Sequence, residues 1–257
     1  MSGYVRLCVD EGVATILMDR PRRNVVDVEF AEELHAAAVD AARRDDVRAV
    51  VIWGGERIFT VGGDIAVMAA RSVDGIRPVV SAVGDAVAAI EAIPKVVIAA
   101  VNGLCLGAGT EIALAADFRY AATTALFGQP EISFGIMPGA GATQRLPRLI
   151  GRSAAKDMIF SGRRVKAREA LAMGLVDRVL EPCAVYAAAV ASATAYAAGP
   201  LAALGAAKAA IDARDDAVPQ DGLDLERDLF CDLFQTEDQK EGMRAFLENR
   251  KPAFKGR

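Results

Sequence analysis

Two glutamates, Glu111 and Glu131, are the residues of this sequence best suited to acid–base chemistry. Glu111 lies among Leu, Ile and Ala residues, where a carboxylate is costly unless it is paired or used. Glu131 follows 20 positions later, after Gln129-Pro130. Two carboxylates in one pocket can serve as proton donor and base if their surroundings separate their pKa values. The pattern leaves two alternatives open: Glu111 only complements a helix N-terminus, and Glu131 is a solvated loop acid.

Glycine-rich turns accompany these acids. A buried strand ends before Gly107-Ala108-Gly109, and a helix begins there, so its first backbone N–H groups point at whatever lies at the strand end. Gly62-Gly63 follows another predicted strand, which indicates either exposed N–H groups or a simple turn capped by Asp64. These glycines do not have the spacing of a dinucleotide-binding loop. The turns therefore indicate close backbone approach to a ligand of another kind.

The composition excludes several classes of protein. The single histidine, His35, falls in a predicted amphipathic helix, which excludes a histidine-based metal site. The net charge of −4 and the lack of a long basic run exclude a nucleic-acid footprint, and we expect Arg163-Arg164 with Lys166 to be a solvated helix start. No uncharged apolar stretch is long enough to span a membrane, and the N-terminus has no signal-peptide pattern. Four scattered cysteines indicate reduced core thiols in a cytoplasmic protein.

Strands alternate with helices over roughly the first 180 residues, which predicts an α/β fold. The predicted strands are Tyr4–Val9, Val13–Met18, Ala49–Trp53, Lys95–Val101, Phe118–Ala121 and Leu175–Leu180. The first two should form a hairpin, and the clearest helices are Val28–Arg43, capped by Asp27, and Gly75–Glu91. From Pro200 onward the helices are apolar around more of their circumference, which indicates a packing or oligomerisation segment.

The order of the motifs resembles the enoyl-CoA hydratase/isomerase (crotonase) superfamily, and enoyl-CoA hydratases most of all. The resemblance rests on the segments Asn102–Ala113, Gln129–Ile132, Pro138–Leu146 and Glu237–Phe246, with Lys251–Phe254. It implies a crotonase-like spiral of ββα units with the active site in residues 1–195. It also implies a helical oligomerisation region in residues 196–257 that builds homotrimers, or hexamers made of two trimers.

The resemblance implies hydration of trans-2-enoyl-CoA to 3-hydroxyacyl-CoA. The backbone N–H groups of Gly63 and Ala108 would bind the thioester oxygen, and a backbone donor needs no particular side chain at position 108. Glu111 would accept a proton from water and Glu131 would donate one to the substrate.

By the same resemblance, the substrate and its coenzyme A would contact Val61, Asp64, Ile65 and Gly139. The partner is an acyl-CoA thioester, and no metal or further cofactor is implied. Two alternatives stay open: an enoyl-CoA double-bond isomerase, and a non-catalytic acyl-CoA-binding assembly subunit. The second would not need two intact carboxylates.

Overall fold

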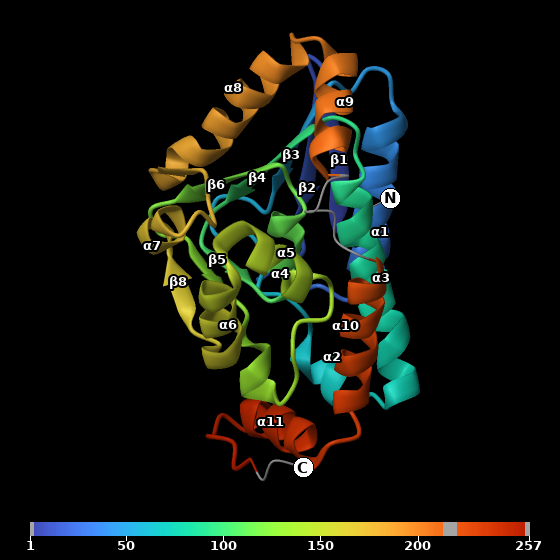
Figure 1. Cartoon of the computed structure of the whole chain (residues 1–257), viewed down its shortest axis with the longest axis vertical. Coiled ribbons are helices and arrows are strands. Elements are labelled where there is room, and N and C mark those ends of the chain that lie inside the picture. The colour runs from blue at the N-terminus through green and yellow to red at the C-terminus, as the bar shows by residue number, and fades with distance from the viewer. Residues whose placement is uncertain (1–2, 213–219, 255–257) are drawn as a thin grey trace.

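The computed structural model describes residues 3–212 and 220–254 and contains two β-sheets with helices around them (Figure 1). The larger sheet has six strands in the order β1-β2-β3-β4-β6-β9, and all neighbours are parallel except β1 and β2. Its strands are β1 (Val5–Asp10), β2 (Val13–Met18), β3 (Ala49–Trp53), β4 (Val96–Val101), β6 (Phe118–Ala122) and β9 (Arg178–Leu180). The sequence therefore predicted the α/β class and each strand of this sheet.

The β1–β2 hairpin forms as the sequence predicts. Asp10 pairs with Val13, and the two turn residues, Glu11 and Gly12, have φ values of 45° and 83°. Positive φ at both central residues is the geometry of a tight hairpin turn. The β-branched runs of β3 and β4 then pair in parallel at the centre of the sheet, where they are buried on both faces.

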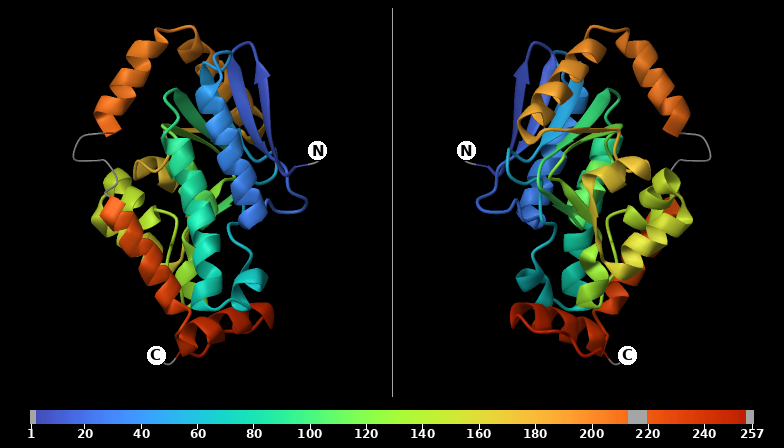
Figure 2. Two further views of the ribbon diagram at one scale, coloured as in Figure 1. Left: turned by 90° about the vertical axis from the view of Figure 1, so that its right-hand side faces the viewer. Right: turned by 90° about the vertical axis from the view of Figure 1, so that its left-hand side faces the viewer.

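Helices cover both sides of the larger sheet (Figure 2). Helix α1 (Val28–Arg43) begins at Asp27, whose side chain accepts a hydrogen bond from the Phe30 N–H at 3.0 Å, as predicted. Helix α3 (Val73–Glu91) lies beside α1 and starts two residues before the predicted helix. Helix α8 (Val185–Ala197) packs against β3 and β4.

A second sheet of three short strands was not predicted. It consists of β5 (Leu104–Leu106), β7 (Leu126–Gly128) and β8 (Arg164–Lys166), in that order. Strand β8 corrects the expectation of a helix start at Arg163-Arg164, because pairing with β7 extends this segment and helix α7 begins only at Ala167. The predicted strand Leu175–Leu180 is also shorter, since only Arg178–Leu180 pairs with β6.

The remaining short helices connect the two sheets and surround their edges. They are α2 (Ile65–Ala69), α4 (Ala108–Leu114), η1 (Pro130–Phe134), α5 (Ala142–Ile150), α6 (Arg152–Ser161), α7 (Ala167–Ala172) and η2 (Pro182–Ala184). Within the described ranges, no single helix is long and apolar enough to cross a membrane; η2–α8 and α9 pass such a test only as a pair bent by 108°. The expectation of core thiols is half wrong, since Cys105 and Cys231 are buried but Cys8 and Cys183 are exposed.

Three C-terminal helices follow, and they differ in what they contact. Helix α9 (Leu201–Asp212) buries none of its residues and projects from the body (Figure 2), to which Lys208 ties it through an ion pair with Asp117 at 3.1 Å. Helix α10 (Gln220–Leu233) packs against α3, and α11 (Glu237–Leu247) packs against η1 and α2. Helix α11 therefore lies against the element that carries Glu131 and against the helix that follows the Gly62-Gly63 loop.

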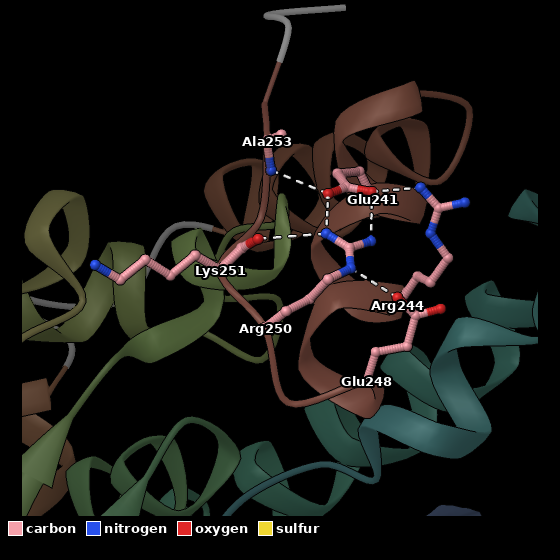
Figure 3. A network of polar contacts seen from close by, with 6 residues as sticks. All are labelled: Glu241, Arg244, Glu248, Arg250, Lys251 and Ala253. Carbon is pink, nitrogen blue, oxygen red and sulfur yellow. Dashed lines mark hydrogen bonds and ion pairs between the residues drawn. The ribbon is translucent and has the colours of Figure 1, made fainter.

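The segment that follows α11 is held on that helix by Glu241 (Figure 3). Its carboxylate accepts hydrogen bonds from the Arg250 guanidinium at 2.6 and 3.0 Å and from the Ala253 N–H at 3.0 Å, and it also pairs with Arg244. These contacts hold the pKa of Glu241 well below its usual range. The network fixes the segment after α11 to that helix.

Candidate active site

Glu111 projects from the first turn of the short helix α4. The helix starts after Gly107, whose φ of 53° favours glycine. The Glu111 side chain is buried, with 3% of the residue exposed. Its Oε1 accepts hydrogen bonds from the N–H groups of Ala140 (2.8 Å) and Ala142 (3.0 Å). The carboxylate is therefore held in one position by the backbone of a distant turn.

The surroundings of Glu111 favour its neutral form. Burial, and then the negative charge of Glu226, raise the pKa of Glu111 to about 7. The two N–H donors and the Arg145 guanidinium act in the opposite direction. Because a general base works best with a pKa near the operating pH, Glu111 is suited to exchange protons at neutral pH.

Glu131 lies in the 3₁₀ helix η1 and faces the same cavity as Glu111. Burial and the charge of Glu111 raise the pKa of Glu131 well above its usual range. The buried Gln129 lies beside it: with its amide nitrogen turned toward the carboxylate, Nε2 donates to the two oxygens of Glu131 at 3.0 and 3.1 Å. The structure thus brings the two predicted glutamates together in one electrostatically coupled pair.

Two backbone turns meet beside this pair. The turn at Gly62 has a φ of 87°, and a Cβ on that residue would come within 2.6 Å of the Leu106 oxygen and 3.3 Å of the Ala108 nitrogen. Such a close approach requires glycine. Gly63 and Ala108 both line the cavity that contains the carboxylates. The two residues expected to supply N–H donors therefore lie at the same cavity as the acids.

The cavity has a volume of about 310 Å³ and an apolar wall. That wall is formed by Val79, Val80, Val83, Ile136 and Phe230. Titratable groups in an apolar cavity with N–H groups nearby are suited to move protons to and from a carbonyl compound with a hydrophobic tail.

The other predicted contact residues also lie at cavities. Gly139 lines the first cavity, and Val61 and Ile65 line a second cavity of about 350 Å³. Asp64 lines both, and its side chain also caps α2 by accepting from the N–H groups of Ala66 (2.9 Å) and Val67 (3.1 Å). Asp64 therefore caps helix α2, which follows the Gly62-Gly63 turn, and the cap holds it at the junction of the two cavities.

Three functional candidates were missed from the sequence. Helix α10 brings Glu226 and Phe230 to the site, and Arg164 lines the second cavity together with Arg23. Glu226 is surrounded in the sequence by other charged residues, so no local pattern distinguishes it. Arg164 was expected on a helix, and only the pairing of β8 with β7 reveals where it lies. A buried acid on a helix of mixed polarity is visible only in three dimensions.

The sequence is similar to proteins of one known family. Residues 9–257 match the family model described as enoyl-CoA hydratase/isomerase. A protein of Rhizobium meliloti named as a probable enoyl-CoA hydratase is 41% identical over 251 residues, covering 95% of each chain.

Solved structures match along almost the whole chain. The crystal structure of an enoyl-CoA hydratase from Mycobacterium avium subsp. paratuberculosis K-10 has a TM-score of 0.88 at 30% identity and covers 98% of this chain and 99% of its own. That of an enoyl-CoA hydratase from Bacillus anthracis has a TM-score of 0.80 at 35% identity and covers 99% and 100%. The arrangement of two sheets with C-terminal helices is therefore shared with these proteins.

Proposed function

Because the chain belongs to the enoyl-CoA hydratase/isomerase family, we propose that it adds water to trans-2-enoyl-CoA thioesters to give 3-hydroxyacyl-CoA. One observation carries this proposal: Glu111 and Glu131 face one apolar cavity, and both have pKa values raised from the ordinary value. Hydration needs a base for water and an acid for carbon, and two carboxylates of this kind supply both.

The thioester carbonyl would lie between the N–H groups of Gly63 and Ala108. When water adds at C3, negative charge develops on the thioester oxygen. Fixed N–H donors stabilise that charge by about 3–4 kcal/mol each in a site from which water is largely excluded. The approach of the Gly62 turn to Ala108 supports this placement, because it holds the two donors on one side of the cavity.

The water oxygen forms a bond to C3, and Glu111 takes the proton that the water loses. The π electrons of the C2–C3 bond shift to C2 and the thioester, and C2 takes the proton of Glu131. Glu131 is the more suitable donor because its pKa is raised well above the usual range, while the two N–H groups on Glu111 favour its ionised form. Transfer of a proton from Glu111 to Glu131 restores the pair.

The second cavity is suited to the coenzyme A part of the substrate. It shares Gly63, Asp64 and Glu131 with the first cavity, so a ligand can extend from one into the other. Arg23 and Arg164 line it and would face the phosphates, and an arginine fork binds phosphate well. Val61 and Ile65 would contact the pantetheine and adenine.

Two alternatives are less well supported. A double-bond isomerase moves a proton between C2 and C4 and needs only one carboxylate for it. A non-catalytic acyl-CoA-binding subunit needs neither carboxylate. Burying two mutually repelling carboxylates costs stability, so their presence favours a reaction that uses both.

We further propose that residues 1–195 form a spiral of ββα units that contains the site, and that residues 196–257 contribute to a homotrimer or a hexamer. Helix α9 supports this, because it buries none of its residues in the single chain and Ile211 is 67% exposed. Lys208 ties α9 to Asp117 at 3.1 Å, but an apolar helix that buries none of its residues is typical of a subunit contact.

The function is tested by mixing purified protein with crotonyl-CoA and following the ultraviolet absorbance of the conjugated thioester. We expect the band to decrease and mass spectrometry to detect 3-hydroxybutyryl-CoA. If the band is unchanged with crotonyl-CoA and with longer 2-enoyl-CoAs, hydration is wrong, and a 3-enoyl-CoA then tests the isomerase.

A further inference from the structure

Helix α10 brings a third carboxylate to the amino end of α5. Glu226 is buried, with 2% of the residue exposed. Its Oε1 accepts a hydrogen bond from the Gly141 N–H, and its Oε2 accepts from both the N–H (2.8 Å) and the hydroxyl of Thr143. An amino end of a helix favours negative charge because its first N–H groups have no partner within the helix.

The same turn also binds Glu111, and its backbone N–H groups donate in turn along the sequence to one carboxylate and then to the other. The N–H groups of Ala140 and Ala142 donate to Glu111, whereas those of Gly141 and Thr143 donate to Glu226. Four consecutive N–H groups thus form a single bridge between two acids from different helices. A change in the position of either carboxylate must move the donors of the other.

The turn can take this form only with glycine at position 141. Its φ is 112°, and a Cβ there would overlap the guanidinium of Arg145. Arg145 in turn donates to the Ala140 oxygen at 3.2 Å and pairs with Glu91 of α3 at 2.6 Å. The turn is therefore held from α5, α3 and α10 together.

The donors favour the ionised form of Glu226 over that of Glu111. Both oxygens of Glu226 accept hydrogen bonds, whereas both donors to Glu111 reach the same oxygen, Oε1. Charged groups of three neighbouring elements interact with Glu226: Glu111 of α4, Glu131 of η1 and Arg145 of α5. Glu91 of α3 pairs with Arg145, and the Arg227–Asp85 ion pair joins α10 to α3.

We propose that Glu226 is a positioning residue that acts through Glu111: it fixes the turn that holds Glu111 and places a second negative charge beside it. Its consequence for catalysis rests on the proposed hydratase function. Burial raises the pKa of Glu226, and its hydrogen bonds from Thr143 and Gly141 counteract that effect. While Glu226 is ionised, its charge contributes to the raised pKa of Glu111, which is about 7.

The first experiment does not depend on activity. Protein labelled with ¹³C at the glutamate side-chain carboxyl is titrated by NMR, and the Glu111 signal is identified by its loss in Glu111→Gln. In Glu226→Gln the negative charge is gone while a carbonyl acceptor stays. We expect the midpoint of the Glu111 titration to move to lower pH by about one unit, because a like charge has been removed.

Asp228→Asn is the matched control for this titration. It removes the same charge from the same helix, at a position that is 58% exposed and paired with Arg77. The Glu111 midpoint should be unchanged in this variant. An unchanged midpoint in Glu226→Gln, or an equal shift in both variants, would overturn the proposal.

The second experiment measures hydration of crotonyl-CoA against pH. Loss of activity on the acidic side reports protonation of the base, so this limb of the kcat/KM profile should move to lower pH in Glu226→Gln. In Glu226→Ala the turn loses its hydrogen bonds to the Glu226 carboxylate. The kcat should therefore decrease about 10- to 100-fold with little change in KM. An acidic limb that stays at the wild-type pH in active Glu226→Gln would contradict the proposal. If the NMR midpoint moves but the wild-type protein hydrates no enoyl-CoA, the hydratase function is wrong and the positioning role of Glu226 stands.

Discussion

Gly107 lies against the carboxylate of Glu131: a Cβ built on this glycine would come within 2.8 Å of the Glu131 Oε1. Gly107 also immediately precedes helix α4, which begins at Ala108 and carries Glu111 three residues later. This one glycine therefore leaves room for the side chain of Glu131 and lies at the start of the helix that carries Glu111.

Gly107→Ala should therefore inactivate the protein without unfolding it. The new methyl group would displace Glu131 from its place beside Glu111, and misplacement of a catalytic group on this scale costs about 100-fold in kcat. The decrease should appear in the initial rate of crotonyl-CoA hydration.

Gly55→Ala is the control for backbone strain. Gly55 also has a positive φ, 94°, but nothing lies within 4 Å of a Cβ built there. Both variants should lose a similar stability, about 1 kcal/mol, because both force alanine into a left-handed conformation. Equal losses of turnover in the two variants would mean that strain, and not contact with Glu131, explains the effect.

Glu131→Gln should lower kcat by about 10²- to 10⁴-fold and leave acyl-CoA binding almost unchanged. The amide keeps the shape of the side chain but cannot give a proton to C2. Turnover is measured with crotonyl-CoA, and binding is measured by calorimetry with a saturated acyl-CoA. Near wild-type turnover would rule out Glu131 as the acid.

Glu111→Gln should lose activity but gain stability at alkaline pH. The folded pKa of about 7 lies above the unfolded value, so the wild-type protein loses stability as pH rises through this range. The neutral amide avoids that loss, which is at most about 4 kcal/mol above pH 7 and vanishes below the unfolded pKa of about 4.3. The difference in free energy of unfolding between variant and wild type, from urea titrations, should grow from pH 5 to pH 8. A difference independent of pH would contradict the raised pKa.

Phe230→Ala should favour longer acyl chains. Phe230 lines the first cavity and packs over Gly139, where a Cβ would meet its ring at 2.8 Å. Removing the ring opens the apolar wall, so the ratio of kcat/KM for a ten-carbon 2-enoyl-CoA to that for crotonyl-CoA should rise about tenfold.

Phe234→Ala tests whether this effect is local. The two rings touch, with centroids 5.5 Å apart, but Phe234 does not line the first cavity. Both variants should lose stability through the cavity they create in the core. A change in chain-length ratio in Phe234→Ala as large as in Phe230→Ala would point to disorder of α10 as the cause.

The sequence predicts the larger sheet well because all of its strands except β9 have five or six residues, which is long enough to carry a pattern. The runs at Ala49–Trp53 and Lys95–Val101 are apolar and β-branched, and the cap at Asp27 marks the start of α1. The three-residue strands β5, β7 and β8 are too short to show periodicity, and each exists only because the others pair with it. Because strand β8 could not be predicted, a helix start was wrongly expected at Arg163-Arg164.

Part of the candidate site is predictable because some of its residues lie in recognisable local motifs. Glu111 and Glu131 lie in local motifs, and glycines mark the turns at Gly63 and Ala108. Glu226 and Phe230 reach the site only through the packing of α10, about 100 residues further along the chain. The distribution of amides between Glu111 and Glu226 is a property of the folded turn, and no sequence spacing encodes it.

The most direct test of the hydratase function is to run the reaction with crotonyl-CoA in water labelled with ¹⁸O and, separately, in D₂O, and to analyse the product by mass spectrometry. We predict one ¹⁸O atom at C3 of the 3-hydroxybutyryl-CoA and one deuterium on carbon at C2, each lost when Glu111 or Glu131 is replaced by glutamine. A product that carries deuterium but no oxygen from the solvent would contradict hydration and indicate movement of the double bond instead.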